Sequence, residues 1–407
     1  MNKYIPLTGG LLFCLQLTNP GLGVAGERDY FQPYIYEKSY FDSNLLLLPD
    51  KNDRAYTWSA ASRSDIVNQL TLGTKLDYAY KRQKIHADFS VRDNRYANNQ
   101  PLNYLGTDDK LSMEWRAGKH LYGEIGYGYQ KVLDSFIYYQ TPLKNLITFN
   151  NAYFDAKYTW HPRWTLKGGM EFMDSANSNE QRVSFDRQIA KTVISLNYLI
   201  GTNYTQTIEY TSTFVNNVNR RPNYVTEAEN KYTIDTIGLR SFWYLSPKKL
   251  HLITEISEAQ LKNSHFSVRD FSDTIGRLTF KWDVNAKVHW SFMIWKNVYP
   301  SQGSYGSYVV SEGISPSLEW NAQNKLTFKA KYLNRHDNYT GPSFVQQTIG
   351  TASTRTDNVT QLQTEAIYAP NKNIEIGLTL TAENRHSSIS DWSYTDYISA
   401  VNAKFTF

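Results

Sequence analysis

The chain has 407 residues, of which 15% are aromatic, including 31 tyrosines and 10 tryptophans. Its mean hydropathy is nevertheless −0.54, and no internal run reaches the roughly 18 apolar residues that a membrane-spanning helix needs. The formal net charge of +5 is small for this length, so composition gives no reason to expect nucleic acid as a partner.

The N-terminus has the three parts of a secretory signal peptide. Lys3 supplies the positive start, residues 11–15 the apolar stretch, and Gly23-Val24-Ala25 a small-x-small cleavage site. We predict cleavage after Ala25, with Gly26 as the next choice. Residues 1–25 are then the signal peptide, and residues 26–407 are predicted to form the outer-membrane barrel that the following segments indicate.

Cys14 is the only cysteine, and it lies in this apolar stretch. Bulky Phe13 precedes it, where a lipoprotein acceptor would need a small residue. The mature chain would therefore contain no cysteine and no disulfide. The chain also has no zinc-ligand spacing and no glycine-rich phosphate loop, so we expect neither a metal nor a cofactor.

Segments of period two recur from the first third of the chain to its end. In residues 70–78, one face carries Leu70, Leu72, Leu76 and Tyr78, and the other carries Thr71, Gly73, Lys75 and Asp77. Residues 85–92, 288–295 and 374–381 repeat this alternation. A barrel in lipid needs this pattern, because every backbone group must pair and one face meets lipid.

Short and long connections alternate along the chain, and this is the second indication of a membrane barrel. The short turns are predicted at residues 81–84, 117–119, 161–163, 201–203, 246–249, 283–285, 321–324 and 369–372. The long polar excursions are predicted at 42–64, 94–107, 133–146, 174–188, 214–229, 260–270, 298–311, 337–356 and 385–392. The fold class is therefore all-β: a transmembrane antiparallel up-and-down barrel of about 18 strands (16–18), with short periplasmic turns and long extracellular loops. A barrel of this size leaves an aqueous lumen.

Aromatic residues flank the short turns and predict a periplasmic girdle. They are Trp115, Tyr122, Tyr158, Trp160, Trp164, Trp243, Tyr244, Trp282, Trp320 and Tyr368. The alternative is a row of rings that stack on sugars.

The C-terminus ends in an alternating strand whose apolar face carries Val401, Ala403, Phe405 and Phe407. We predict that this strand closes the barrel against the first one. Val401, Phe405 and Phe407 would form the terminal signal that the barrel-assembly machinery reads, which places the protein in the Gram-negative outer membrane in contact with its lipids. A last strand of a soluble all-β domain is the alternative.

The inward face is predicted to carry nearly balanced charge. Its basic members are Lys75, Arg92, Arg116, Lys157, Lys167, Arg277, Lys281, Lys329, Lys331 and Arg335. Its acidic members are Asp77, Asp88, Glu114, Glu124, Asp155, Glu171, Glu209, Glu255, Glu319 and Glu375. Such a surface suits a neutral or weakly charged polar solute, or it is simply a wet interior braced by ion pairs.

Within this face, Lys329, Lys331 and Arg335 lie along one edge and are the best candidates for a track that binds acidic sugars. We add Arg277, Lys281, His289, Trp295 and Glu319 as candidate lumen contacts. Catalysis is not expected, because His86 with Asp88, and His289 with Ser291, are i, i+2 neighbours about 7 Å apart on a strand.

A run of four leucines, residues 45–48, lies outside any normal membrane strand. Either the first strand continues above the membrane and packs within its own loop, or the run folds inward as a constriction. The sequence leaves both open.

The chain resembles the EpsL family of outer-membrane barrels, which occurs in exosortase-associated exopolysaccharide gene clusters. The resemblance covers nearly the whole mature chain. It is carried by residues 33–34, 40–45, 48–50, 63–65, 81–83, 92–96, 104–106, 124–127 and 308–311. It implies a role in biosynthesis or export of an extracellular polysaccharide, with the polysaccharide chain and periplasmic export proteins as partners, and it identifies no catalytic residue. The alternative function is a general or sugar-selective diffusion porin; an outer-membrane enzyme that modifies polysaccharide or lipid is third.

Overall fold

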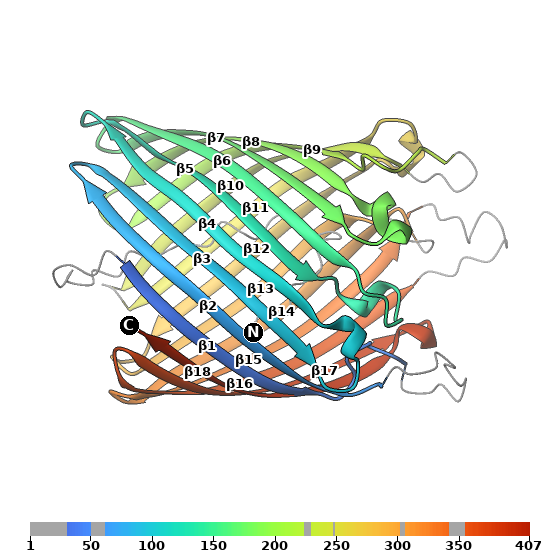
Figure 1. The fold of residues 1–407 in the computed structure, drawn as a ribbon. Helices are drawn as coiled ribbons and strands as arrows, with labels where there is room; N and C mark the ends of the chain where they lie inside the picture. Colours follow the sequence, from blue (N-terminus) through green and yellow to red (C-terminus); the bar gives the residue numbers. More distant parts are fainter. Residues whose placement is uncertain (1–30, 50–61, 224–228, 247–248, 302–305, 342–354) are drawn as a thin grey trace.

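The structure is a closed β-barrel (Figure 1). It is a computed structural model that describes residues 31–49, 62–223, 229–246, 249–301, 306–341 and 355–407. These residues form one sheet of 18 strands in which each strand is antiparallel to its sequence neighbour and β18 also pairs with β1. The predicted fold class is confirmed at the upper end of the expected strand count. The predicted signal peptide, 1–25, lies outside the described residues.

The strands have the following bounds: β1 Phe31–Asp42, β2 Asp65–Tyr80, β3 Gln83–Tyr96, β4 Tyr104–Ala117, β5 Leu121–Leu133, β6 Leu146–His161, β7 Trp164–Asn177, β8 Arg187–Ile200, β9 Tyr204–Asn216, β10 Lys231–Ser246, β11 Leu250–Asn263, β12 Phe271–Asp283, β13 Val288–Pro300, β14 Tyr308–Gln323, β15 Leu326–Thr340, β16 Thr356–Asn371, β17 Ile374–Ser387 and β18 Tyr394–Thr406. Five short 3-10 helices lie in the connections: η1 Gln100–Leu102, η2 Phe136–Tyr138, η3 Glu180–Phe185, η4 Ser267–Arg269 and η5 Ser390–Trp392.

Connections of two lengths lie at opposite ends of the barrel, as predicted (Figure 1). At the short-turn end, only Lys81 and Arg82 separate β2 from β3. Lys81, Gly118 and Gly201 have positive φ there (56°, 69° and 62°), which a tight hairpin requires. All five 3-10 helices lie in connections at the other end, which we call the long-loop end.

Side chains alternate between an apolar outer face and a polar inner face. On β2, Leu70 and Leu72 are exposed on the outside, whereas Thr71 between them is buried on the inside. This arrangement follows from the period of two in the sequence. No helix within the described residues is both long and apolar enough to cross a membrane.

Aromatic side chains surround the short-turn end, and Trp160, Trp282 and Trp320 are exposed there. Two members of the predicted girdle are instead in contact with inward-facing groups. Tyr122 lies under the Arg116 guanidinium and the Lys157 ammonium, at 5.6 and 5.9 Å from its ring centroid. Tyr244 packs edge-on against His251. Trp243 next to Tyr244 is exposed on the outer face, so the regular alternation points Tyr244 inward; the register shift comes after it, between Tyr244 and Ser246.

The seam between β18 and β1 closes the barrel. Its register runs from Tyr34 opposite Thr406 to Asp42 opposite Ile398. The Phe407 backbone N–H donates to the Pro33 carbonyl at 2.9 Å, and the Val401, Phe405 and Phe407 side chains are exposed. Their role as an assembly signal stays a prediction.

Deletion of Phe407 is expected to lower the amount of protein in the outer membrane, because it removes the terminal aromatic carboxylate and one hydrogen bond of the seam. Immunoblots of purified outer membranes would measure this level. Deletion of Phe31, which is also exposed at the short-turn end, is the matched control. Normal levels of the Phe407 variant would contradict the assembly-signal interpretation.

Candidate functional site in the barrel lumen

The leucine run of residues 45–48 folds against the inner wall near the long-loop end. Leu46 is 2% exposed and packs in a buried cluster with Tyr40 and Val67 of that wall. Phe136 of η2 joins the same cluster, and Tyr139 packs against its edge. Of the two interpretations of this run, inward folding is therefore the one that the structure shows for Leu46.

Hydrogen bonds join the two inward-folded connections to each other and to the loop before β18. The Gln140 side-chain amide donates to the Leu47 carbonyl at 2.8 Å and to the Asp391 carbonyl at 3.1 Å. The Asn44 side chain donates to the carbonyl of Thr395 at 3.1 Å. Leu47 and Gln140 both have positive φ, 53° and 44°, a conformation that costs about 1–2 kcal/mol for such residues. The surrounding bonds hold these two backbones in place.

Two groups of the connection between β5 and β6 are strongly shielded from water. Burial raises the pKa of the Asp134 carboxyl, although Asn145 and Arg182 act in the opposite direction. Burial also raises the pKa of the Tyr139 hydroxyl, with a further contribution from Asp134. The Arg182 guanidinium lies 5.0 Å from the Tyr139 ring centroid and 3.7 Å from the Asp134 carboxylate.

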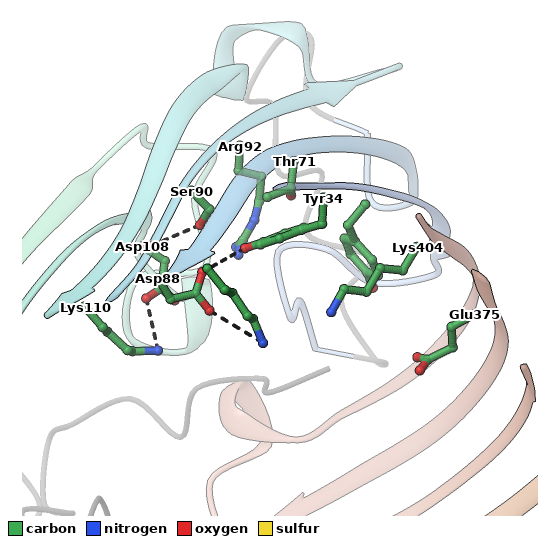
Figure 2. Close-up of a pocket in the computed structure, with 11 residues that line it drawn as sticks. Tyr34, Thr71, Asp88, Ser90, Arg92, Asp108, Lys110, Glu375 and Lys404 are labelled. Atoms are coloured by element: carbon green, nitrogen blue, oxygen red, sulfur yellow. Dashed lines mark hydrogen bonds and ion pairs between the residues drawn. The ribbon is translucent and has the colours of Figure 1, made fainter. Parts of the chain in front are cut away.

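A polar hollow lies on the inner wall formed by β1–β4 with β17 and β18 (Figure 2). It encloses about 360 Å³. Two ion pairs brace its floor: Lys75 with Asp88 at 3.8 Å, and Lys110 with Asp108 at 3.1 Å. These pairs join neighbouring strands or positions on one strand, and they fix the wall's charges in place.

Tyr34 forms a flat surface at the centre of this hollow. Its ring covers Gly73 on β2, where an added Cβ would lie 2.3 Å from the tyrosine Cζ, so a larger residue at this position would displace the ring. Its hydroxyl donates to Asp88 at 3.1 Å, and the Lys404 ammonium lies 5.1 Å from its ring centroid (Figure 2). The ring is thus held from three sides.

The wall formed by β10–β15 carries most of the lumen contacts that the sequence predicted. Arg277 and Arg240 both bind the Glu255 carboxylate, at 2.6 and 3.1 Å. Arg335 binds Asp337 at 2.9 Å. The structure thus places Arg277 and Arg335 in bracing ion pairs.

The remaining predicted lumen contacts have different neighbours on the inner wall. His289 contacts Asp283 at 2.6 Å. The Trp295 ring covers Gly313 of the next strand, where a Cβ would lie 2.4 Å from the tryptophan Cζ2. Lys329 lies opposite Glu319 in the ladder, and Lys331 lies opposite Ser317. Lys281 lies opposite His251 on β11 and Ser291 on β13. Their roles as solute contacts stay predictions.

Sequence reasoning missed Tyr34, Tyr36 and Lys404, although it assigned Lys75, Asp88, Arg92 and Glu375 of the same hollow to the inward face. Tyr34 and Tyr36 alternate with Ile35 along β1, so the period of two was available as a signal. The period of two does not show that Tyr34 lies opposite Gly73, because this pairing depends on the register between strands.

No protein-family model matches the chain, and no curated protein matches it by sequence. Among solved structures, a BenF-like porin from Pseudomonas fluorescens Pf-5 is similar with a TM-score of 0.51 and 11% identity, over 94% of this chain and 100% of that one. OccAB3 from Acinetobacter baumannii has a TM-score of 0.50 and 9% identity, with coverage of 93% and 99%. OpdK from Pseudomonas aeruginosa, solved with vanillate, has the same TM-score, identity and coverage. At these identities the likeness shows the fold.

Proposed function

We propose that this protein is an outer-membrane channel through which small polar solutes diffuse, a porin of Gram-negative bacteria. The observation that carries the proposal is an 18-stranded closed barrel whose inner wall is lined by charged and hydroxyl groups around a lumen wide enough for water. Two long connections fold inward near one end, which is how a channel restricts solute size. The similar solved structures include a BenF-like porin and OpdK with vanillate.

The lining argues against catalysis as the main role. Many of its charged groups are held in ion pairs, such as Lys84 with Glu114 of the neighbouring strand at 3.2 Å. Such pairs brace a wet wall, whereas a catalytic acid or base needs hydrogen-bond reach of the substrate and a pKa matched to its task.

Polysaccharide export is the second candidate. The resemblance to the EpsL family supports it, and so does one feature of the structure. Residues of two separate resembling segments, 40–45 and 104–106, meet in the inward-folded cluster, where Tyr40 and Tyr104 are both buried and Leu45 packs against them. A polymer conduit would place its selective element at such a point.

Purified protein in planar lipid bilayers tests the first candidate. A porin is expected to give stable single-channel currents in salt and to pass small sugars in liposome swelling. A deletion strain that retains its surface polysaccharide would agree with this function. A strain that loses surface polymer and accumulates it in the periplasm would instead favour export and overturn the porin proposal.

Neutralising Lys329, Lys331 and Arg335 together, each to Gln, is expected to slow passage of acidic solutes and leave barrel assembly intact. The reason is that Lys329 and Lys331 form no ion pair with the described residues, so their charge is available to a solute. Flux of an acidic sugar into proteoliposomes measures the effect. Substituting three turn lysines, Lys287, Lys325 and Lys372, by Gln is the matched control. Unchanged flux in the first variant would remove these residues from the pathway.

A further inference from the structure

A single row of side chains crosses five adjacent strands of the hollow shown in Figure 2. Glu375 on β17 lies opposite Lys404 on β18, and Lys404 lies opposite Tyr36 on β1. Tyr36 lies opposite Thr71 on β2, which in turn lies opposite Arg92 on β3. All five line the hollow. The spacing between strands sets Lys404 and Arg92 about 14 Å apart along the wall.

The charges of this row differ from those beside it because they are not neutralised by an ion pair. Elsewhere in the same hollow, the Lys75 and Lys110 ammonium groups form ion pairs with Asp88 and Asp108. Among the described residues, by contrast, Arg92 and Glu375 form no ion pair or side-chain hydrogen bond, and the only aromatic contact of Lys404 is with Tyr34. Ion pairs brace the wall, so unpaired charges in the same wall are free to meet a solute.

Two buried groups at the row lack the partners that burial normally demands. Lys38, two positions along β1 from Tyr36, is 6% exposed, and its ammonium lies 5.2 Å from the Tyr40 ring centroid without an ion pair to any described residue. Thr71 is 4% exposed, and its hydroxyl has no hydrogen-bond partner. A buried cation next to an unsatisfied hydroxyl is complementary to an oxyanion that also carries hydroxyl groups.

We infer that this row is a binding subsite for a hydroxylated carboxylic acid, the chemistry of a sugar acid. The inference rests on the proposed channel function and names the solute class. The carboxylate is bound by Arg92 and Lys38, because a guanidinium and an ammonium together neutralise one planar anion. The Thr71 and Tyr36 hydroxyls bind hydroxyl groups of the solute, and the fixed Tyr34 ring supports its apolar side.

The carboxylates near the row restrict this class further. Asp88 and Asp108 are neutralised by their lysines. Glu375 lies at one end of the row opposite Lys404, and Glu365 on β16 acts electrostatically on Lys38. A second negative charge on the solute would meet these carboxylates. The site therefore favours one anionic group per solute over two.

Block of the ion current through the full-length channel in bilayers tests the inference with four probes: glucuronate, glucose, cyclohexanecarboxylate and inorganic phosphate. Glucuronate is expected to block at roughly tenfold lower concentration than glucose, which lacks the charge, and than cyclohexanecarboxylate, which lacks the hydroxyls. Equal block by glucose, equal block by cyclohexanecarboxylate, or tighter block by phosphate would each overturn the assignment to a hydroxylated carboxylate.

Variants locate the site. Arg92→Gln and Lys38→Gln are each expected to weaken glucuronate block by roughly tenfold. Thr71→Val, which keeps the shape and removes only the hydroxyl, is expected to weaken glucuronate and leave cyclohexanecarboxylate unchanged. Lys191→Gln removes an inward charge of β8 far from this wall and is the matched control. Block that is unaffected by the first three variants, or equally weakened by the control, would overturn the site.

The failure of this subsite and the failure of the channel function give different results. A protein that conducts ions but shows no preference for glucuronate is a channel without the subsite. If the protein does not conduct, calorimetric titration of the detergent-solubilised barrel with glucuronate still measures binding. Binding that is lost in Arg92→Gln would then support the subsite without a channel, and absence of binding would overturn it.

Discussion

Replacing Asp357 with Asn should lower the free energy of unfolding by about 3 kcal/mol or more, because it removes the anion from a buried ionic cluster. Asp357 on β16 is fully buried. The Arg355 guanidinium binds it at 2.8 and 3.0 Å, and the Arg385 guanidinium of β17 contacts the same carboxylate. Because Asn has nearly the same shape as Asp, the decrease in the free energy of unfolding measures the effect of removing the charge.

Urea unfolding of the barrel in lipid vesicles, followed by tryptophan fluorescence, measures this loss. Asp391→Asn, at an exposed aspartate of η5, is the matched control and should change stability little. Replacing Arg355, Asp357 and Arg385 together by Met, Leu and Met should restore most of the stability, since no buried charge is then left uncompensated. A stable Asp357→Asn barrel would show that water reaches this cluster.

Replacing residues 134–145 by a short Asn-Gly turn should raise the single-channel conductance by about twofold or more, because it removes an inward-folded segment that narrows the pore. The segment contributes Phe136 and Tyr139 to the inward-folded cluster, and the new turn suits the β5–β6 hairpin. Larger sugars should pass the variant and not the parent in liposome swelling.

A smaller change tests the same element without removing it. Gln140→Ala cuts the two hydrogen bonds to Leu47 and Asp391 and should increase current fluctuations more than mean conductance. Shortening the connection that contains η4, between β11 and β12, is the control on a different part of the rim. Unchanged conductance after removal of residues 134–145 would mean that the narrowest point of the path lies elsewhere.

Strands and faces were predictable from the sequence because both are local properties. A period of two assigns alternate residues to opposite faces, so it predicts Lys75, Arg92 and Glu375 on the inner wall without knowledge of the register between strands. Turn residues such as Gly118 and Gly201, which have positive φ, marked the hairpins.

Register and loop packing were not predictable, because they depend on contacts between distant parts of the chain. The pairing of Tyr34 with Gly73, and of Arg277 with Glu255, follows from where each ladder begins. The leucine run is equally apolar whether it packs within its own loop or against the lumen wall, so the sequence does not distinguish these two placements. Tyr244 follows the outward-facing Trp243, so the regular alternation points Tyr244 into the lumen, where it lies opposite His251. Proximity to a turn alone does not place an aromatic residue in the girdle.

The seam between β1 and β18 has a consequence for the folding rate. It pairs Tyr34 with Thr406, residues from opposite ends of the described chain, so barrel closure has a very high contact order and is expected to be slow. Until it forms, β1 and β18 are both unpaired edges, each able to pair with another chain. Aggregation during refolding should therefore depend on the lifetime of this open sheet, and a chaperone that covers either edge should raise the folded yield.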